Sequence, residues 1–264
     1  MAPGQGRDFP LWLVVLGGAL VWAFALALTS DVHAQILATV WKGLGVTLLV
    51  TATAFAGASA LGLLLALGSL SRLWLVRQAV RLYVEVMRGI PIIVLLLYVA
   101  FVGVPLAVEA WNALGLAPLR TRAVPLLWRA VAALVLAYAS FLAEVFRAGI
   151  LSVDPGQIEA AKALGLNRVQ RFRLIVAPQA FSVILPPYGN DFVAMVKDSS
   201  LVSVLGVTDV TQLGKVAAAG NFRYFETYNM VALIYLTLTV SLSLALRRLE
   251  ERLRARAGAG PGRR

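Results

Sequence analysis

The apolar positions of this chain gather into long runs that carry few or no charged residues. An α-helix rises 1.5 Å per residue, so about 20 apolar residues cross a hydrocarbon layer of about 30 Å. Six runs reach this length once their edges are counted, which predicts an all-α transmembrane protein. The predicted spans are residues 11–29, 43–71, 89–108, 126–146, 179–200 and 227–246.

Two of these runs hold features that need protein or water beside them. The uncharged part of the fourth run is too short by itself, so Arg129 or Glu144 must lie within the membrane or at its edge. Pro186 and Pro187 interrupt the fifth run, and the carbonyls that prolines leave unpaired are tolerated only against protein or a water-lined cavity. Residues 201–226, between the last two runs, are predicted to form a mixed loop.

The first run has two interpretations. Val32-His33-Ala34 resembles a small-residue cleavage site, so a cleaved signal peptide is one of them. However, 19 apolar residues are long for a signal core, and only Arg7 and Asp8 precede them. These features favour a helix that stays in the protein.

Composition agrees with a membrane protein and excludes several kinds of chemistry. Hydrophobic residues make up 60% of the chain and charged residues 14%, whereas soluble domains carry about 25% charged residues. There is no cysteine, which excludes disulfides, iron–sulfur clusters and thiol catalysis. The single histidine, His33, has no acidic cluster near it, and no G-x-x-x-x-G-K-[ST] phosphate loop is present. We expect no catalytic residue, no metal and no cofactor.

The positive charges indicate orientation rather than nucleic-acid binding. The formal charge is +11, but the basic residues do not form one patch with interleaved aromatics. Most of the 24 lysines and arginines lie in segments 72–88 and 147–173 and in the C-terminal tail. Cytoplasmic loops are rich in such residues, so these segments and both termini are predicted to be cytoplasmic, with the spans in contact with lipid.

A polar stretch between the fourth and fifth spans carries strong helix signals. Asp154 can accept from the free N–H groups of a helix that begins at Pro155. Gln157 has the spacing that completes a capping box. Gly165 tolerates the positive φ at which such a helix ends.

The start signal is then repeated. Asn167 and Gln170 predict a second short helix, which is expected to end before Pro178. The two helices carry the basic residues Lys162, Arg168, Arg171 and Arg173. Two capped helices of this kind predict a docking platform for a partner; the alternative is an amphipathic helix lying on lipid headgroups.

The spacing within this stretch carries a family resemblance. Glu159-Ala160-Ala161 is followed after three residues by Gly165, and after nine more by Ile175-Val176-Ala177-Pro178. This resembles the E-A-A…G…I-x-L-P loop of ABC importer permease subunits, with Ala177 where leucine is usual. The resemblance implies a coupling helix whose small side chains let it seat in a groove of an ATP-binding subunit. The residues to which it assigns this role are Asp154, Pro155, Gly156, Gln157, Glu159, Ala160, Ala161 and Gly165.

Three further motifs resemble permeases for polar amino acids. Residues 84–94 follow V-E-V-x-R-G-x-P-x-x-V, although Leu95 stands where glutamine is common. Residues 143–161 match A-E-(I/V)-x-R-x-G-I-x-S-V-x-x-G-Q-x-E-A-A, and residues 196–201 read VKDSSL. The resemblance covers about residues 43–248, and the first span lies outside it.

The resemblance implies an ABC importer permease fold with a five-span core and one extra N-terminal span. The expected divisions are residues 1–42 (extra helix and outer loop), 43–248 (core, with the coupling segment 147–177) and 249–264 (basic cytoplasmic tail). The chain would be a non-catalytic subunit in a bacterial cytoplasmic (inner) membrane. Its expected partners are ABC ATPase subunits, a second permease subunit and an extracytoplasmic solute-binding protein. Together they would import a polar amino acid at the expense of ATP.

Charged residues within or beside the spans are functional candidates, because burying them is costly. Glu144 with Arg147, and Glu85 with Arg88, are three residues apart and can pair as structural contacts or gates. An amino acid offers an ammonium and a carboxylate, which suits a path lined by Asp and Lys; alternatively these charges only neutralise other helix charges. The candidate path consists of Asn190, Asp191, Met195, Lys197, Asp198 and Ser199.

Two rival classes remain open at this point. A secondary transporter or channel would be driven by an ion gradient through Glu144, Asp191 and Asp198. Such a carrier has no need of the capped coupling segment. An integral membrane enzyme is disfavoured because the sequence shows no nucleophile–base–acid set.

Overall fold

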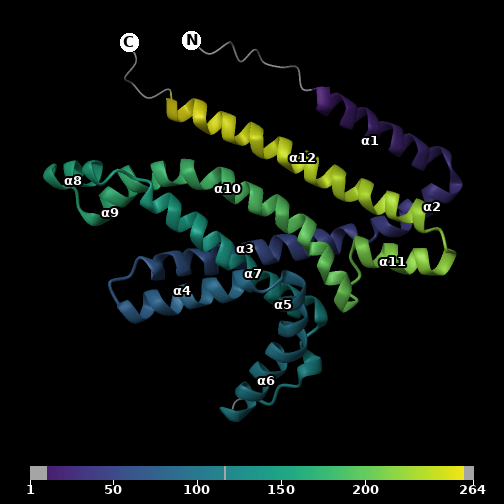
Figure 1. The fold of residues 1–264 in the computed structure, drawn as a ribbon, viewed down its shortest axis with the longest axis horizontal. Coiled ribbons are helices and arrows are strands. Elements are labelled where there is room, and N and C mark those ends of the chain that lie inside the picture. The colour runs from purple at the N-terminus through teal and green to yellow at the C-terminus, as the bar shows by residue number, and fades with distance from the viewer. Residues whose placement is uncertain (1–10, 116, 259–264) are drawn as a thin grey trace.

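The computed structural model describes residues 11–115 and 117–258, and every regular element in these ranges is a helix (Figure 1). The α-helices are α1 (Leu11–Thr29), α2 (Asp31–Trp41), α3 (Leu44–Ser69), α4 (Trp74–Gly89), α5 (Ile92–Tyr98), α6 (Val104–Ala113), α7 (Leu126–Leu151), α8 (Pro155–Ala163), α9 (Arg168–Arg171), α10 (Ala177–Asp198), α11 (Val210–Asn221) and α12 (Tyr224–Gly258). Two π-helical turns, Val99–Gly103 and Phe172–Val176, and two 3-10 segments, Thr121–Ala123 and Ser199–Leu205, connect some of them. The all-α prediction is confirmed.

Within the described residues, four helical segments are long and apolar enough to cross a membrane. They are Asp31–Ser69, Ile92–Ala113, Leu126–Leu151 and Tyr224–Leu253. The first predicted span coincides with α1. The fifth coincides with α10, which has the required length but carries Asp191, Lys197 and Asp198.

Two predicted loops are helical instead. Residues 201–226 contain most of the second 3-10 segment and all of α11, and the loop expected before residue 43 contains α2. The Asp209 side chain caps α11 by accepting from the Gln212 N–H at 2.8 Å. Apolar positions four residues apart on α2, Ile36 and Val40, are buried against α12 residues such as Met230. A local cap thus begins α11, whereas tertiary burial of apolar side chains stabilises α2.

The main core lies where α7 packs along α3, with α5 and α10 beside them. Small residues on α3 allow this approach. A Cβ atom built on Gly62 would meet the Cβ of Leu142 at 2.9 Å, and one built on Gly57 would meet a methyl of Val135 at 2.8 Å. Both glycines are therefore needed for two long helices to lie in contact over their full length.

Each π-helical turn is followed by one residue and then a proline. Val104 donates its N–H to the carbonyl of Val99, and Ala177 donates to that of Phe172, both five residues back. A proline has no N–H to donate to the preceding turn. The wider π turn shifts the hydrogen-bond pattern by one residue just before the proline, so the helix continues past it. The second short helix, α9, ends at Arg171, before Pro178 as predicted, but the chain stays helical through the π turn into α10.

Pro186 and Pro187 also lie inside a continuous helix. The structure places both within α10, so the predicted interruption of the fifth span is wrong. The helix continues because its other residues keep their backbone hydrogen bonds and one face packs on α7 and α12. Gly189 lies on this face, and a Cβ atom built on it would lie 3.3 Å from a methyl of Leu246.

Candidate functional site

The first helix of the coupling segment is capped at both ends. The Asp154 carboxylate accepts from the Gly156 N–H at 2.7 Å. At the other end Gly165 adopts φ +77°, as predicted, and the N–H of Leu166 reaches back to the carbonyl of Ala161 at 3.1 Å. This closing bond and the left-handed glycine make a Schellman motif, so the ends of α8 are fixed by local contacts.

The predicted capping box at Gln157 is not formed. Its side-chain carbonyl instead accepts from the Gln179 side chain at 2.6 Å, which ties α8 to the start of α10. The box predicted at α9 is present, because the side chain of Asn167 accepts from the Gln170 N–H and the Gln170 side chain accepts from the Asn167 N–H, both at 2.9 Å. Each short helix therefore has its own start signal, but only α9 has the reciprocal pair.

The outer surface of the coupling segment is apolar and basic. Glu159 and Ala160 are exposed, whereas Ala161 is buried. Within residues 164–174, four large apolar side chains are exposed by more than half: Leu164, Val169, Phe172 and Leu174. Lys162, Arg168 and Arg173 are exposed in the same segment. Exposed apolar side chains grouped with charges are typical of a protein contact surface.

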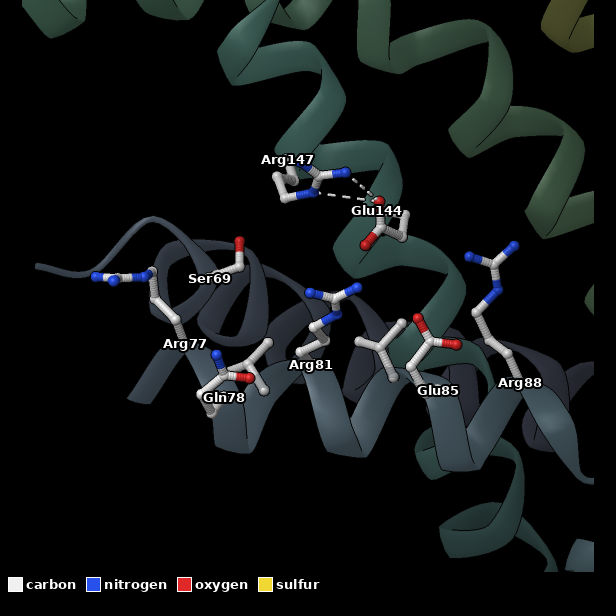
Figure 2. Close-up of a pocket in the computed structure, with 10 residues that line it drawn as sticks. Ser69, Arg77, Gln78, Arg81, Glu85, Arg88, Glu144 and Arg147 are labelled. Carbon is white, nitrogen blue, oxygen red and sulfur yellow. Dashed lines mark hydrogen bonds and ion pairs between the residues drawn. The ribbon is translucent and has the colours of Figure 1, made fainter. Parts of the chain in front are cut away.

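A charged cavity of about 510 Å³ opens between α3, α4 and α7 (Figure 2). Helix α4 supplies most of its polar side chains, because Arg77, Arg81, Glu85 and Arg88 recur every three or four residues and share one face. On the opposite face of α4, Leu75, Leu82 and Val86 are exposed. The full lining is Ser69, Arg77, Gln78, Val80, Arg81, Val84, Glu85, Arg88, Glu144 and Arg147.

The structure brings together one of the two predicted charge pairs. Arg147 contacts Glu144 at 2.7 Å through Nη2 and 3.2 Å through Nε. Glu85 and Arg88 do not pair: the Arg88 guanidinium lies over the ring of Phe141, 5.5 Å from its centroid. In Figure 2 the α4 side chains rise toward the α7 pair, so both pairs line the same space.

The six residues of the candidate substrate path do not line one cavity. Met195 and Ser199 are buried in the core, whereas Asn190 and Lys197 are exposed. Lys197 faces a separate space of about 230 Å³ between α10 and α12. Asp198 accepts a hydrogen bond from the Tyr138 hydroxyl at 2.7 Å. Asp191 keeps one buried oxygen without a partner among the described residues.

Sequence reasoning missed several residues that the structure places in polar contacts. Arg77 and Arg81 served only to predict orientation, although their spacing on one helix face was the signal for a polar lining, and Gln78 was not singled out. Tyr138 lies in an apolar run and gave no signal. Arg129, expected within the membrane or at its edge, is only 8% exposed.

Arg129 is held by carbonyls and not by a carboxylate. Its guanidinium donates to Val124 at 2.9 Å, to Ala100 at 3.0 Å and to Thr121. The Ala100 carbonyl belongs to the first π turn, where Pro105 lacks the N–H that would continue the pattern. The arginine thus supplies a hydrogen bond that the helix cannot.

Comparisons with known proteins agree on one family. Residues 58–255 match the family described as binding-protein-dependent transport system inner membrane component. The chain is 36% identical over 200 residues to the probable amino-acid permease protein YxeN of Bacillus subtilis (strain 168), covering 76% of this chain and 84% of that protein. It is 34% identical over 197 residues to the glutamine transport system permease protein GlnP of Escherichia coli (strain K12), covering 75% and 84%.

A solved structure has the same fold. A chain from the crystal structure of an amino acid ABC transporter with histidines superposes with a TM-score of 0.70 and 33% sequence identity. The match covers 85% of this chain and 97% of the other.

Proposed function

The chain belongs to the family of binding-protein-dependent transport system inner membrane components, and on that premise we propose that it forms the membrane path of an ATP-driven importer for a polar amino acid. The observation that carries the proposal is the doubly capped coupling segment with its exposed apolar and basic surface. The relatives named as amino-acid and glutamine permeases support the substrate class. A gradient-driven carrier gains no support from these comparisons.

The proposed partner of the coupling segment is an ABC ATPase subunit. Glu159 and Ala160 face outward beside the exposed Leu164, and the small alanine lets the helix axis approach a groove closely. A full transporter would contain a second permease subunit, a pair of ATPases and an extracytoplasmic solute-binding protein. The chain itself would carry no catalytic residue, since ATP would be bound by the partner.

The proposed orientation places the coupling segment in the cytoplasm. Figure 1 shows α8, α9, the turn between α3 and α4 and the C-terminal end of α12 toward one end of the molecule, with α2 and α11 at the other. The first end carries the basic segments, as the positive-inside rule requires. The divisions 1–42, 43–248 and 249–264 are proposed on the same grounds, with both termini cytoplasmic.

The proposed path for the solute uses polar groups at two places. The charged cavity is lined by α4 and by Glu144 and Arg147 of α7, and it offers charges of both signs. On α10, the members of the predicted path that are exposed or half-buried are Asn190, Asp191, Lys197 and Asp198. Met195 and Ser199 would support that helix from the core, and Asp191 would add a carboxylate beside it.

The mechanism proposed is alternating access. ATP would bind more tightly to the closed ATPase pair, and this difference in affinity supplies the free energy that shifts the permease between its two states. Closure would move α8, and the side-chain contact between Gln157 and Gln179 connects α8 directly to the base of α10. The Glu144–Arg147 pair, at the end of α7, would act as a structural contact in this state.

The test is co-purification of an ATPase subunit with the native chain and with two double variants. Glu159→Lys with Gly165→Val changes the coupling segment, and we expect the ATPase to be lost. Glu109→Lys with Gly115→Val is the matched control, because Glu109 is exposed on α6 and Gly115 adopts φ +72° in an open loop. Loss of the ATPase from both variants, or from neither, would count against the docking role.

A further inference from the structure

The side chains of α4 form an ordered row of charges inside the charged cavity. Arg81, Glu85 and Arg88 lie four and three residues apart, so they follow one another along one face over about 10 Å. The signs along the row are positive, negative and positive. Figure 2 shows all three on the side of α4 that faces α7.

The charged groups of this row form no ion pairs with other described residues of the chain. Arg81 and Glu85 form no hydrogen bond or ion pair among the described residues. The Arg88 guanidinium lies over the face of Phe141 and donates no hydrogen bond among the described residues, so its N–H groups are able to donate. These opposite charges lie on adjacent turns of α4 and do not pair with one another. Each of them is therefore available to a ligand.

The remaining charges of the cavity contribute a positive excess. Glu144 and Arg147 neutralise each other at 2.7 Å. Arg77 turns back to the carbonyls of Ser71 and Arg72, both at 2.9 Å, yet its positive charge still faces the cavity. A cavity lined by one predominant sign attracts solutes of the other sign.

We propose that the charged cavity selects a dicarboxylic amino acid, such as glutamate, whose two carboxylates bind Arg81 and Arg88 while its ammonium lies at Glu85. This inference rests on the proposed function and adds the class of substrate to it. The solute carries the signs negative, positive and negative, which complement the row on α4. Guanidinium groups bind carboxylates through two parallel hydrogen bonds, and arginine side chains are long enough to close on a small molecule. A cationic amino acid would meet the positive excess without a second carboxylate to offset it.

Arg81 is the residue that decides between a dicarboxylic and a neutral amino acid. Glu85 and Arg88 suffice for one ammonium and one carboxylate, which every amino acid has. Arg81 supplies the position for a second carboxylate, and it lies outside the 84–94 motif that the chain shares with other polar amino-acid permeases.

The test measures binding of three amino acids to the purified full-length chain in neutral detergent by saturation-transfer NMR. The probes are L-glutamate, L-glutamine and L-arginine, titrated separately at low salt. We expect glutamate to bind roughly fivefold more tightly than glutamine, and the difference to shrink as salt screens the charges. Arg81→Gln should remove the preference while leaving the affinity for glutamine unchanged, and Arg81→Lys should keep part of it.

The matched control is Arg72→Gln, since Arg72 is exposed in the turn before α4 and does not line the cavity. Equal affinity for glutamate and glutamine, or tighter binding of arginine, would overturn the proposal. So would displacement of glutamate by an equal concentration of sn-glycerol 3-phosphate, which would indicate a phosphate or lipid-headgroup site. ATPase co-purification is a separate readout, so a failure here leaves the proposed function standing and removes only the substrate class.

Discussion

The clearest quantitative prediction concerns Arg129, which connects α7 to the first π turn and to residues 121–124. It is 8% exposed and donates to three carbonyls, one of them the buried Ala100 carbonyl of the first π turn. Replacing it with methionine keeps the apolar stem and removes every donor. A buried carbonyl left unsatisfied costs about 1–3 kcal/mol, and bonds from a charged donor contribute about 1.5–3 kcal/mol. Methionine carries no charge that must be buried, and this offsets part of the cost. We therefore expect the free energy of unfolding to fall by about 3 kcal/mol.

The assay is unfolding by SDS titration in mixed micelles, followed by tryptophan fluorescence. Arg122→Met is the control, because Arg122 is a nearby arginine that is exposed. A second variant tests the reason for the loss. Pro105→Ala restores an N–H for the Ala100 carbonyl, so Arg129→Met should cost about 1 kcal/mol less in that background. An equal cost in both backgrounds would refute the link between the arginine and the π turn.

Three further predictions follow from the fold and the coupling segment. Gly165→Val alone should uncouple ATP hydrolysis from transport in proteoliposomes, because a branched residue at φ +77° distorts the end of α8; unchanged coupling would contradict this. Gly62→Leu should lower the free energy of unfolding by about 1–3 kcal/mol, measured by the same SDS titration, because the new side chain meets Leu142. Lys197→Gln and Asp198→Asn should each weaken uptake several-fold while the ATPase still co-purifies, and normal uptake in both would remove α10 from the path.

The spans could be predicted because a membrane helix needs a continuous run of apolar residues, which is a local feature of the sequence. Long apolar runs set the positions of α1, α3, α7 and α12 to within a few residues at most ends, although α12 runs further at its C-terminus. Helix α11 was not predicted, although Asp209 caps it locally; the Asp209 carboxylate also accepts from the Tyr235 hydroxyl at 3.1 Å. That contact spans 26 residues of sequence, and no local pattern indicates it.

The candidate site was predictable in the same uneven way. Caps at Asp154 and Asn167 depend on a few adjacent residues, and the structure shows both. The predicted substrate path depended on which residues of α10 face the core. A spacing of seven residues shows that two residues share a helix face, but it does not show whether that face is buried. The polar row on α4 was visible in the sequence as charges recurring every three or four positions, but only packing against α7 encloses it as a cavity.

The failure of the capping box at Gln157 shows how the coupling segment is connected to the membrane helices. A box needs the glutamine to fold back onto the residue that begins its own helix, but here the side chain extends to Gln179 at 2.6 Å. Gln179 also donates to the carbonyl of Ile175 at 3.0 Å, inside the π turn that precedes α10. The Gln179 side chain therefore contacts both α8 and the π turn that precedes Pro178. Because a π turn has a weaker and less regular hydrogen-bond pattern than an α-helix, displacement of α8 is expected to change the backbone here first. In the proposed mechanism, the hydrogen bond between Gln157 and Gln179 would therefore transmit motion of α8 to α10.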